Sequence, residues 1–380
     1  MTKLKVTFYS NFLNHHVLPL CKELDLICDF KFVASMPLPT EQSLLGYDNL
    51  NDIYDFVVKT YSGCDIEQRT AESLAVESDV VIHGSADFLY LRKRLALDKL
   101  TFKYAERIFK KQWYCYLNPK FISYFYKNYY KYKKNRFYLL SASYYASKDF
   151  NLMGMFRGKS YRWGYFPAVS KRPDYTSKSS SNSNIKIIWC GRFLKWKNPL
   201  FVVRLARYLA DRNINFKIEM IGDGPEFNMI RSEVVKENLL PYIDLTGAVP
   251  VNIVRDKMLT SDICLFTSNK EEGWGAVLNE AMNSGCAVVA SNEAGSVPYL
   301  INDGVNGIKY YNNNLNEFIS CVFRLITSPN LRRSLSKNAI KTTVEEWEAK
   351  NAANLLLKLS TELLKNQCGV VSLSGPCSKI

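Results

Sequence analysis

Residues 268–285 read SNKEEGWGAVLNEAMNSG, and this stretch decides the fold. The apolar run before it, residues 261–267 (SDICLFT), predicts a buried strand. The second half of residues 268–285 carries apolar residues at helical spacing. It predicts a helix that begins near Gly275, with Gly285 as the C-terminal cap. Residues 287–290 (AVVA) predict another strand. Strand, glycine turn, helix and strand in this order are typical of a parallel α/β sheet.

Two glutamates in this stretch are candidate ligand-binding residues. Glu272 precedes the glycine turn and Glu280 lies about a turn and a half into the predicted helix. The glycines allow backbone to approach a ligand, and a helix N-terminus presents unpaired N–H groups to an anion. Two acceptors on either side of such a turn suit a nucleotide sugar, which has hydroxyls at both ends and phosphate between. The alternative is an ordinary βαβ unit with two surface glutamates.

A basic turn lies earlier in the chain. Residues 185–190 (IKIIWC) predict a strand, and Arg192 and Lys197 follow it before an apolar helical pattern begins at Leu200. Open α/β sheets bind ligands at such strand-to-helix turns. Arg can donate to two phosphate oxygens at once and Lys adds a mobile charge. In isolation, such a pair is more often simply solvated.

Taken together, five motifs resemble those of the retaining nucleotide-sugar glycosyltransferases of family 4, which have the GT-B fold. They are GRFLKWKN at 191–198, IGDGPE at 221–226, TGAVP at 246–250, EGWGAVLNEAMNSG at 272–285 and NEAGSVPYLINDGVNGI at 292–308. The resemblance covers about residues 185–330. Two positions depart from the family pattern, because Asn198 stands where glycine is sometimes found and Tyr299 where glutamate is common.

The resemblance implies a role for each matching residue. Arg192 and Lys197 would hold the diphosphate, Glu280 the ribose, and Glu272 the sugar hydroxyls. Val249 would lie near the base. The full substrate-binding set it implies is Glu280, Gly273, Trp274, Gly275, Ala276, Val277, Val249 and Gly222. It also implies retention on one face of the sugar, with the departing phosphate oxygen helping to deprotonate the acceptor.

The fold class that follows is α/β of the GT-B type, with two Rossmann-like domains whose parallel sheets face each other across a cleft. The polar run at 171–184 predicts a linker between an acceptor-side domain, 1–170, and a donor-binding domain, 185–343. The amphipathic stretch 344–364 is expected to cross back to the first domain. Strands are predicted at 3–9, 79–82 and 137–141, and residues 366–380 are expected to be disordered.

The first half contains the remaining candidate catalytic residues. His15, His16 and His83 all lie near predicted strand ends and could bind the donor sugar or the acceptor hydroxyl. The first half also resembles family 4 enzymes that act on cell-surface glycans, in the stretches SNFLNHH at 10–16, YAERIFK at 104–110, LLSASYYASKDF at 139–150 and YRWGYFP at 161–167. Many of these enzymes place a histidine after a middle strand. The segment FKYAER has none, so Glu106 is a further candidate, and the sequence does not choose among the four.

The net charge of +14 is concentrated in the first half. Residues 125–138 (FYKNYYKYKKNRFY) hold seven aromatic and five basic residues. Further basic residues lie just upstream, namely Arg92, Lys93, Arg94, Lys99, Lys103, Arg107, Lys110 and Lys111. This composition predicts an anionic membrane surface as a partner. A nucleic-acid partner is not expected, although the same composition could serve one. The remaining alternative is a solvated helix with tyrosines packed inward.

Several function classes lack their signatures. The ten cysteines form no CxxC pair, only three histidines accompany them, and no Asp-x-Asp occurs, so neither a metal nor another cofactor is expected. Without a signal peptide or an apolar run of membrane-spanning length, we expect a cytoplasmic protein, peripheral on the inner face of the membrane. The predicted function is metal-independent, retaining sugar transfer from a nucleotide diphosphate sugar to a surface polysaccharide or lipid-linked oligosaccharide. The alternatives are a GT-B nucleotide-sugar epimerase and a non-catalytic membrane or nucleic-acid binding protein.

Overall fold

The computed structural model describes residues 3–40, 48–111, 116–168, 184–311, 313–367 and 369–380. The chain divides into two compact units, which we describe separately. Unit 1 comprises Met1–Ala168 and Glu346–Ile380, and unit 2 comprises Val169–Glu345. Residues 171–183 of the predicted linker, 171–184, lie outside the described residues.

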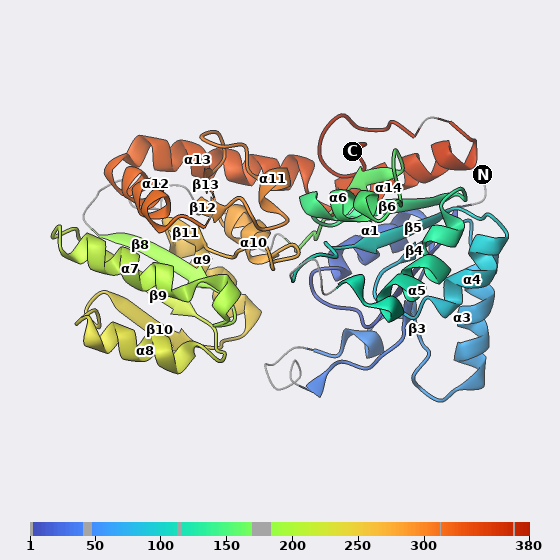
Figure 1. The fold of residues 1–380 in the computed structure, drawn as a ribbon, viewed down its shortest axis with the longest axis horizontal. Helices are drawn as coiled ribbons and strands as arrows, with labels where there is room; N and C mark the ends of the chain where they lie inside the picture. Colours follow the sequence, from blue (N-terminus) through green and yellow to red (C-terminus); the bar gives the residue numbers. More distant parts are fainter. Residues whose placement is uncertain (1–2, 41–47, 112–115, 169–183, 312, 368) are drawn as a thin grey trace. The chain divides into compact units, whose positions relative to one another are not determined.

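Unit 1 contains a parallel sheet in the order β3-β2-β1-β4-β5-β6-β7 (Figure 1). Its strands are β1 (Lys5–Ser10), β2 (Asp29–Ala34), β3 (Val57–Lys59), β4 (Val80–His83), β5 (Thr101–Ala105), β6 (Phe137–Ser141) and β7 (Ser160–Arg162). Its helices are α1 (Leu18–Ile27), α3 (Asp65–Glu77), α4 (Leu89–Ala96), α5 (Pro119–Asn128), α6 (Tyr144–Leu152) and α14 (Ala349–Leu364), with 3-10 turns η1 (Leu50–Asp52) and η3 (Tyr130–Tyr132).

The strands of this sheet are short and apolar, as expected for strands covered on both faces. All four residues of β4 are buried, and so are the four central residues of β1. The strands predicted at 3–9, 79–82 and 137–141 are confirmed as β1, β4 and β6.

The end of the chain belongs to unit 1. Helix α14 packs against α1 (Figure 1), and its buried residues include Leu356, Leu359 and Leu363. The expectation of a disordered tail is wrong for its described residues. Cys377 is fully buried, and the amide of Ile380 donates to the Ser160 carbonyl on β7 at 2.9 Å. The tail therefore covers the backbone of an edge strand, which would otherwise be exposed for pairing.

Unit 2 contains a second parallel sheet in the order β10-β9-β8-β11-β12-β13. Its strands are β8 (Ile185–Cys190), β9 (Phe216–Ile221), β10 (Ile243–Gly247), β11 (Ile263–Phe266), β12 (Ala287–Ser291) and β13 (Ile308–Tyr310). Its helices are α7 (Pro199–Ala210), α8 (Phe227–Lys236), α9 (Val251–Thr260), α10 (Val277–Asn283), α11 (Val297–Leu300), α12 (Leu315–Thr327) and α13 (Pro329–Lys341), with a 3-10 turn η4 (Lys195–Lys197) and a π-helical turn η5 (Thr342–Glu346).

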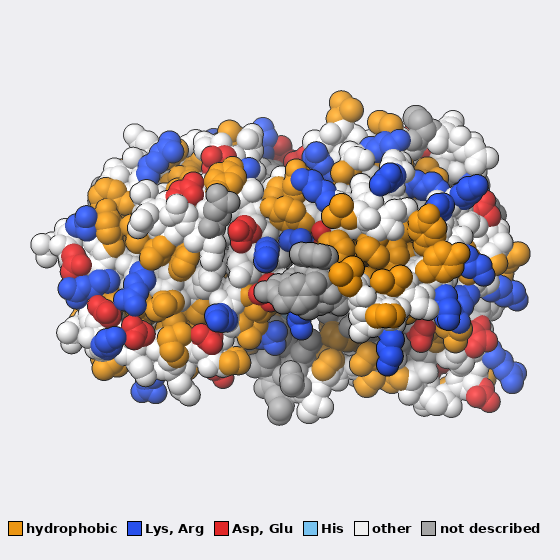
Figure 2. All heavy atoms as spheres, viewed as in Figure 1, with side chains coloured by type: hydrophobic (Ala, Val, Ile, Leu, Met, Phe, Trp, Pro, Cys, Tyr) orange, Lys and Arg blue, Asp and Glu red, His pale blue; other side chains and the backbone are white. Residues whose placement is uncertain are grey.

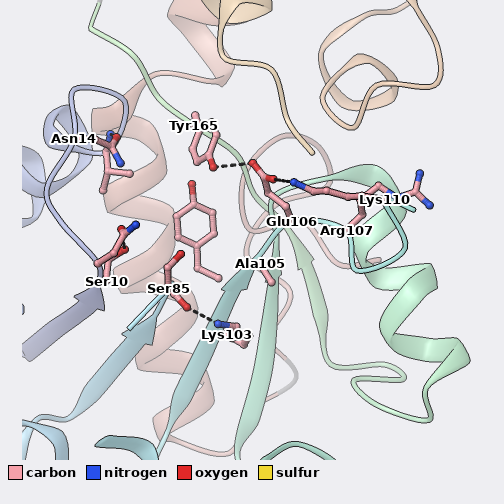
Figure 3. A pocket seen from close by; sticks show the side chains of 13 residues that line it. Ser10, Asn14, Ser85, Lys103, Ala105, Glu106, Arg107, Lys110 and Tyr165 are labelled. Carbon is pink, nitrogen blue, oxygen red and sulfur yellow. Dashed lines mark hydrogen bonds and ion pairs between the residues drawn. The ribbon is translucent and has the colours of Figure 1, made fainter. Parts of the chain in front are cut away.

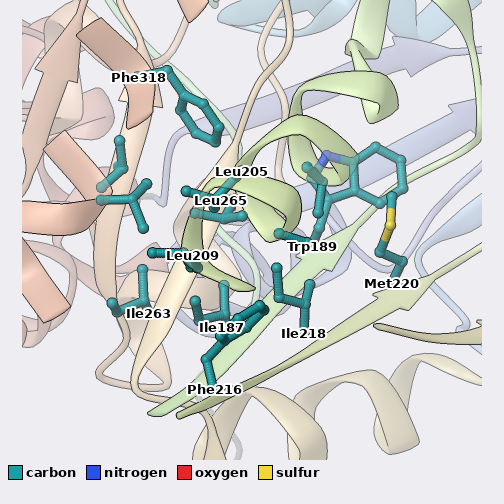
Figure 4. Close-up of a cluster of buried hydrophobic side chains, with 14 of the residues drawn as sticks. Ile187, Trp189, Leu205, Leu209, Phe216, Ile218, Met220, Ile263, Leu265 and Phe318 are labelled. Atoms are coloured by element: carbon teal, nitrogen blue, oxygen red, sulfur yellow. The ribbon is translucent and has the colours of Figure 1, made fainter. Parts of the chain in front are cut away.

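The core of unit 2 lies between this sheet and helices α7 and α12. Leu205 and Leu209 on α7 and Phe318 on α12 meet the strand residues Ile187 and Ile263, and all five are buried (Figure 4). Helix α7 buries one apolar stripe against the sheet and leaves its polar face outward. The strand–helix–strand arrangement predicted around residues 268–285 is confirmed as β11, α10 and β12.

Both sheets share one topological property that positions a ligand site. The chain moves outward from β1 in one direction and from β4 in the other, and likewise from β8 and β11 in unit 2. At such a switch point the loops after the two central strands diverge and leave a crevice at their carboxyl ends. The residues that follow β1, β4, β8 and β11 therefore line the crevice where each sheet can bind a ligand.

Candidate functional site

The basic turn and the first glutamate meet at the switch point of unit 2. Lys197 ends the turn after β8, Glu272 follows β11, and β8 and β11 pair in parallel. The Lys197 Nζ atom lies 2.6 Å from Glu272 Oε2, and the Ser268 hydroxyl donates to the same oxygen at 2.8 Å. The two charged side chains retain only 13% and 11% exposure. The ion pair is thus partly desolvated and fixes both groups at the mouth of the crevice.

Two glycines allow this close assembly. Gly275 has φ +87°, and a Cβ there would lie 2.3 Å from Phe266 Cζ and 3.1 Å from Glu272 Cγ. Gly222, after β9, has φ +130°, and a Cβ there would lie 2.1 Å from the Gly191 carbonyl oxygen. Both positions need the left-handed backbone and the missing side chain. The glycines therefore hold the Glu272 loop and the loop after β8 in place.

Glu280 is held by a residue that the sequence did not indicate. The Arg255 guanidinium on α9 donates to Glu280 Oε1 at 3.0 Å, and the Glu280 side chain is only 7% exposed. Helix α10 begins at Val277, so Glu280 lies in its first turn rather than a turn and a half along. Arg255 belongs to no motif, and a lone arginine in an amphipathic helix gives no signal of such a contact.

The other predicted binding residues differ in what they can offer a ligand. Arg192 is exposed, and Val249 is partly exposed in the loop after β10. The Trp274 side chain is fully buried and its indole N–H donates to Asn279 at 2.9 Å, so only its backbone can face a ligand. The remaining members, Gly273, Ala276 and Val277, continue the same loop into α10.

Asn198, one of the departures from the family pattern, has a structural explanation. It adopts φ 49° and ψ 49°, the left-handed conformation that glycine favours and asparagine tolerates. Its side-chain amide donates to the Thr267 carbonyl at 2.9 Å and so links the turn after β8 to the end of β11. The asparagine thus keeps the backbone geometry and adds a hydrogen bond.

Unit 1 has a cavity of about 430 Å³ at its own switch point. It is lined by residues that follow β1 and β4, by the end of β5 and by the segment after it (Figure 3). The lining residues are Ser10, Asn11, Asn14, Val17, Gly84, Ser85, Lys103, Tyr104, Ala105, Glu106, Arg107, Lys110 and Tyr165. The lining is largely polar and carries three cationic side chains and one carboxylate.

Glu106 is the carboxylate of this cavity. The Tyr165 hydroxyl donates to Glu106 Oε1 at 2.8 Å, and Lys110 Nζ lies 2.5 Å from Oε2 (Figure 3). Burial, followed by the nearby Glu106 charge, raises the pKa of Tyr165 well above its ordinary value, so this phenol stays a donor. Glu106 is thereby oriented within the cavity, in the segment where the family resemblance suggested a catalytic group.

Lys103 and His83 form a buried pair beside it. Lys103 Nζ lies 3.2 Å from His83 Nδ1 and donates to the Gly84 carbonyl, while His83 Nε2 lies 3.3 Å from the Asp87 carbonyl. Burial, then the Lys103 charge, lowers the pKa of His83 well below its ordinary value. Burial lowers the pKa of Lys103 to about 7. His83 is therefore neutral, with Nε2 protonated and Nδ1 free to accept from Lys103.

The three histidines do not gather in this cavity. His83 is 2% exposed and touches the cavity only through Lys103. The rings of His15 and His16 are in contact but tilted by 49°, with centroids 3.8 Å apart, and His16 stacks on Tyr165 at 5.8 Å. The histidine pair therefore lies beside a cavity residue, whereas Glu106 lines the cavity itself.

The aromatic and basic stretch 125–138 is not one continuous helix. It runs through the end of α5, the turn η3 and the start of β6. Four of its seven aromatic residues are buried, namely Phe125, Tyr129, Tyr132 and Phe137. Its lysines at 127, 131, 133 and 134 are exposed. The aromatic part of the predicted membrane surface is therefore largely core, as the solvated-helix alternative expected.

The exposed apolar residues of this region lie on α5 and just before it. Leu117, Ile122, Tyr124 and Tyr126 are each about half exposed or more. Figure 2 shows hydrophobic side chains interspersed with Lys and Arg where Figure 1 labels α5. Two upstream basic residues counted with this surface are in fact buried, because Arg94 is 0% and Lys103 is 8% exposed.

The residues missed from the sequence are Ser268 and Arg255 in unit 2, and Lys103 and Tyr165 in unit 1. Lys103 carried a signal, since a lysine inside the apolar strand sequence TFKYA must either reach solvent or be buried at a cost. Tyr165 follows β7 in the stretch YRWGYFP, which carries part of the family resemblance but does not by itself indicate which of its side chains lines a cavity.

With this geometry established, residues 172–342 match the family model described as "Glycosyl transferases group 1". Over these residues the chain is similar to that family, known as glycosyltransferase family 4, and its two parallel α/β units have the fold of a GT-B-type protein. The matched residues contain Arg192, Lys197, Glu272 and Glu280, and the match ends before α14.

Individual curated glycosyltransferases are also similar to this chain, over a smaller share of its length. An uncharacterized glycosyltransferase of Methanocaldococcus jannaschii is 32% identical over 140 residues, which cover 37% of this chain and 39% of that relative. The chain spans less than half the length of the curated relatives that it matches first.

Solved structures are similar over nearly the whole chain. HepE of Anabaena in complex with UDP superposes with a TM-score of 0.68 and 14% identity, covering 94% of this chain and all of HepE. A glycosyltransferase from Rickettsia africae gives 0.69 and 15%, covering 97% of this chain and all of its own. At these identities the similarity establishes the fold.

Within the residues that the structure describes, no helix combines the length and apolar character that a membrane span requires.

Proposed function

We propose that this protein is a retaining, metal-independent glycosyltransferase that uses a nucleotide diphosphate sugar as donor. The observation that carries the proposal is the Lys197–Glu272 contact of 2.6 Å at the switch point of unit 2, in the same turn after β8 that contains Arg192. A sheet of this order binds ligands at that point, and a cation pair there suits a diphosphate. UDP is the favoured nucleotide, because HepE, of the same fold, was solved in complex with UDP.

Each residue has a distinct part in the proposed reaction. Arg192 and Lys197 balance the charge that develops on the departing diphosphate, which replaces the need for a metal ion. Glu272 has one oxygen, Oε2, engaged by Lys197 and Ser268, and its other oxygen is directed to a sugar hydroxyl. Glu280 accepts from the ribose hydroxyls while Arg255 fixes it.

In the transfer step, the bond between the anomeric carbon and the phosphate oxygen breaks. A bond from the acceptor oxygen to the same carbon forms on the same face, and the acceptor proton passes to the departing phosphate oxygen. Glu106 is our candidate among the residues of unit 1 to orient the acceptor hydroxyl, because it lines the cavity at the switch point of that sheet. A surface polysaccharide or lipid-linked oligosaccharide remains the proposed acceptor, and the cytoplasmic face of the membrane the proposed location.

A panel of UDP-, GDP- and dTDP-sugars tests the donor assignment through thermal unfolding. A true donor binds only the folded protein and raises the melting temperature by mass action. We expect UDP-sugars to raise it and EDTA to leave both this shift and transfer unchanged. A shift that requires Mg²⁺ would contradict the metal-free diphosphate site. Interconversion of the sugar without transfer to water or acceptor would favour an epimerase instead.

A further inference from the structure

The cavity of unit 1 contains an uncompensated cation. Arg107 contacts Asp149 at 3.5 Å, and Lys110 contacts Glu106 at 2.5 Å, so two of its three cationic side chains already have a carboxylate partner. Lys103 forms no ion pair with any carboxylate in the described parts of the chain. It is nevertheless 92% buried, by its 8% exposure, and it lines the cavity.

The hydrogen bonds of the Lys103 ammonium use two of its three donors. An ammonium has three N–H donors. One goes to the Gly84 carbonyl and a second to His83 Nδ1, which leaves the third available to an occupant of the cavity that Lys103 lines.

Arg94 shows how the same unit treats a purely structural cation. It is fully buried, and its guanidinium donates to four backbone carbonyls, those of Ala75, Ser78, Asp79 and Leu100, and to the Thr101 hydroxyl. Lys103, only two residues further along β5 from Thr101, lacks such a shell. A buried charge without compensation is costly, so its position on a cavity wall indicates a partner from outside.

We propose that this cavity binds an anionic group of the acceptor substrate, with Lys103 as its counter-charge and Arg107 and Lys110 at its rim. The inference rests on the proposed function and gives the acceptor a chemical class: a glycan that carries a carboxylate or a phosphate near the hydroxyl that is glycosylated. Glu106 then orients that hydroxyl while Lys103 holds the anion.

The protonation of Lys103 makes the proposal sensitive to pH. Its pKa of about 7 means that the ammonium form is lost as pH rises above neutrality. The pKa of His83 lies well below the ordinary value of a histidine, and the pKa values of Tyr104 and Tyr165 lie well above the ordinary value of a tyrosine. None of these three groups therefore changes its charge in the pH range where Lys103 does. Glu106, Arg107 and Lys110 are the other charged groups of the cavity. Anion binding should therefore weaken between pH 6 and pH 8.5.

Calorimetric titrations of the full chain with saturating UDP present provide the test, because UDP occupies the site in unit 2. The probes are sulfate, as a stand-in for a phosphate group, and methyl α-D-glucuronide, both with constant charge over this pH range, against uncharged methyl α-D-glucoside. We expect at least one anion to bind about tenfold or more tightly than the glucoside at pH 6. Sulfate alone points to a phosphorylated acceptor, and the glucuronide alone to a uronic acid.

Lys103→Gln keeps a donor near the Gly84 carbonyl but removes the charge. It should reduce anion affinity about tenfold and abolish its pH dependence, whereas the exposed Lys120→Gln should match wild type. Lys103→Met serves as a second variant should the glutamine not fold. Equal binding of the anions and the glucoside, or unchanged anion binding in a folded Lys103 variant, overturns the inference. If UDP still binds when the anion test fails, only the anion inference is overturned and the proposed function stands. If the wild-type protein does not bind UDP, the proposed function itself is refuted.

Discussion

At the scale of single residues, the donor site depends on backbone that only glycine permits. Gly275 and Gly304 both have positive φ, +87° and +72°. They differ in what a side chain would meet, because a Cβ at Gly275 would lie 2.3 Å from Phe266, whereas nothing lies within 4 Å at Gly304. The two positions therefore separate backbone strain from displacement of the site.

We expect Gly275→Ala to reduce sugar transfer about a hundredfold, because the added methyl group pushes on Phe266 and on Glu272, and small misplacements of catalytic groups cost this much. Gly304→Ala carries the same type of strain in open space and should keep near-normal turnover. The measurement is kcat/KM for both variants, with melting temperatures to show that each is folded. Equal kcat/KM for Gly275→Ala and Gly304→Ala would mean that transfer does not depend on the close packing of Gly275 against Phe266 and Glu272.

At this scale, the sequence predicts the site residues that belong to a family motif. Arg192, Lys197, Glu272 and Glu280 could be named because their spacing matches a family signature. The partner Arg255 could not, since a hydrogen bond from α9 to α10 depends on packing that no local pattern encodes. Ser268 could not either, because its bond to Glu272, four residues on, depends on how the loop after β11 turns. Trp274 lies in the motif, but burial turned its side chain away from the crevice.

At the scale of elements, the sequence predicts the strands, but it does not predict that the tail after α14 covers the edge strand β7. Strands β6 and β8 lie at the predicted residues, since short apolar runs between polar turns admit few alternatives. From the sequence, the tail after α14, residues 366–380, is expected to be disordered. Its described residues instead hydrogen-bond to β7, which is a long-range contact that composition does not show.

Arg94 is the element-scale residue whose loss should destabilise unit 1 most clearly. It links the end of α3, α4 and the start of β5 through its five hydrogen bonds. Arg94→Leu leaves buried carbonyls without donors and should lower the free energy of unfolding by about 3–5 kcal/mol. Arg92→Leu, exposed on the same helix, should change it by less than about 0.5 kcal/mol. Urea denaturation measures both, and a stable Arg94→Leu protein would refute the structural role.

At the scale of the whole molecule, the net charge of +14 still favours an anionic surface as a partner. Four aromatic residues of 125–138 are buried, so they cannot contact a membrane. The attraction to an anionic surface therefore comes from the exposed lysines of this stretch. Each lysine near an anionic membrane contributes about 1 kcal/mol, and salt screens that attraction.

Replacing Lys127, Lys131, Lys133 and Lys134 with Gln should therefore release the protein from phosphatidylglycerol vesicles, as raised salt should. A matched control replaces four exposed lysines of unit 2, at 186, 236, 337 and 341, and removes the same net charge. Co-sedimentation should show loss of binding in the first variant only. Equal loss in both would indicate general charge attraction without a docking surface, and no loss in either would remove the membrane from the account.

The central claim is that Arg192 and Lys197 hold the diphosphate of the donor. Calorimetric titration with UDP and with uridine tests it most directly, because only UDP carries the diphosphate. Arg192→Ala and Lys197→Ala should each weaken UDP binding about tenfold or more and leave uridine binding unchanged. Lys195→Ala, exposed in the same turn, should bind both as wild type does. UDP affinities for the Arg192 and Lys197 variants that equal that of Lys195→Ala would contradict the account.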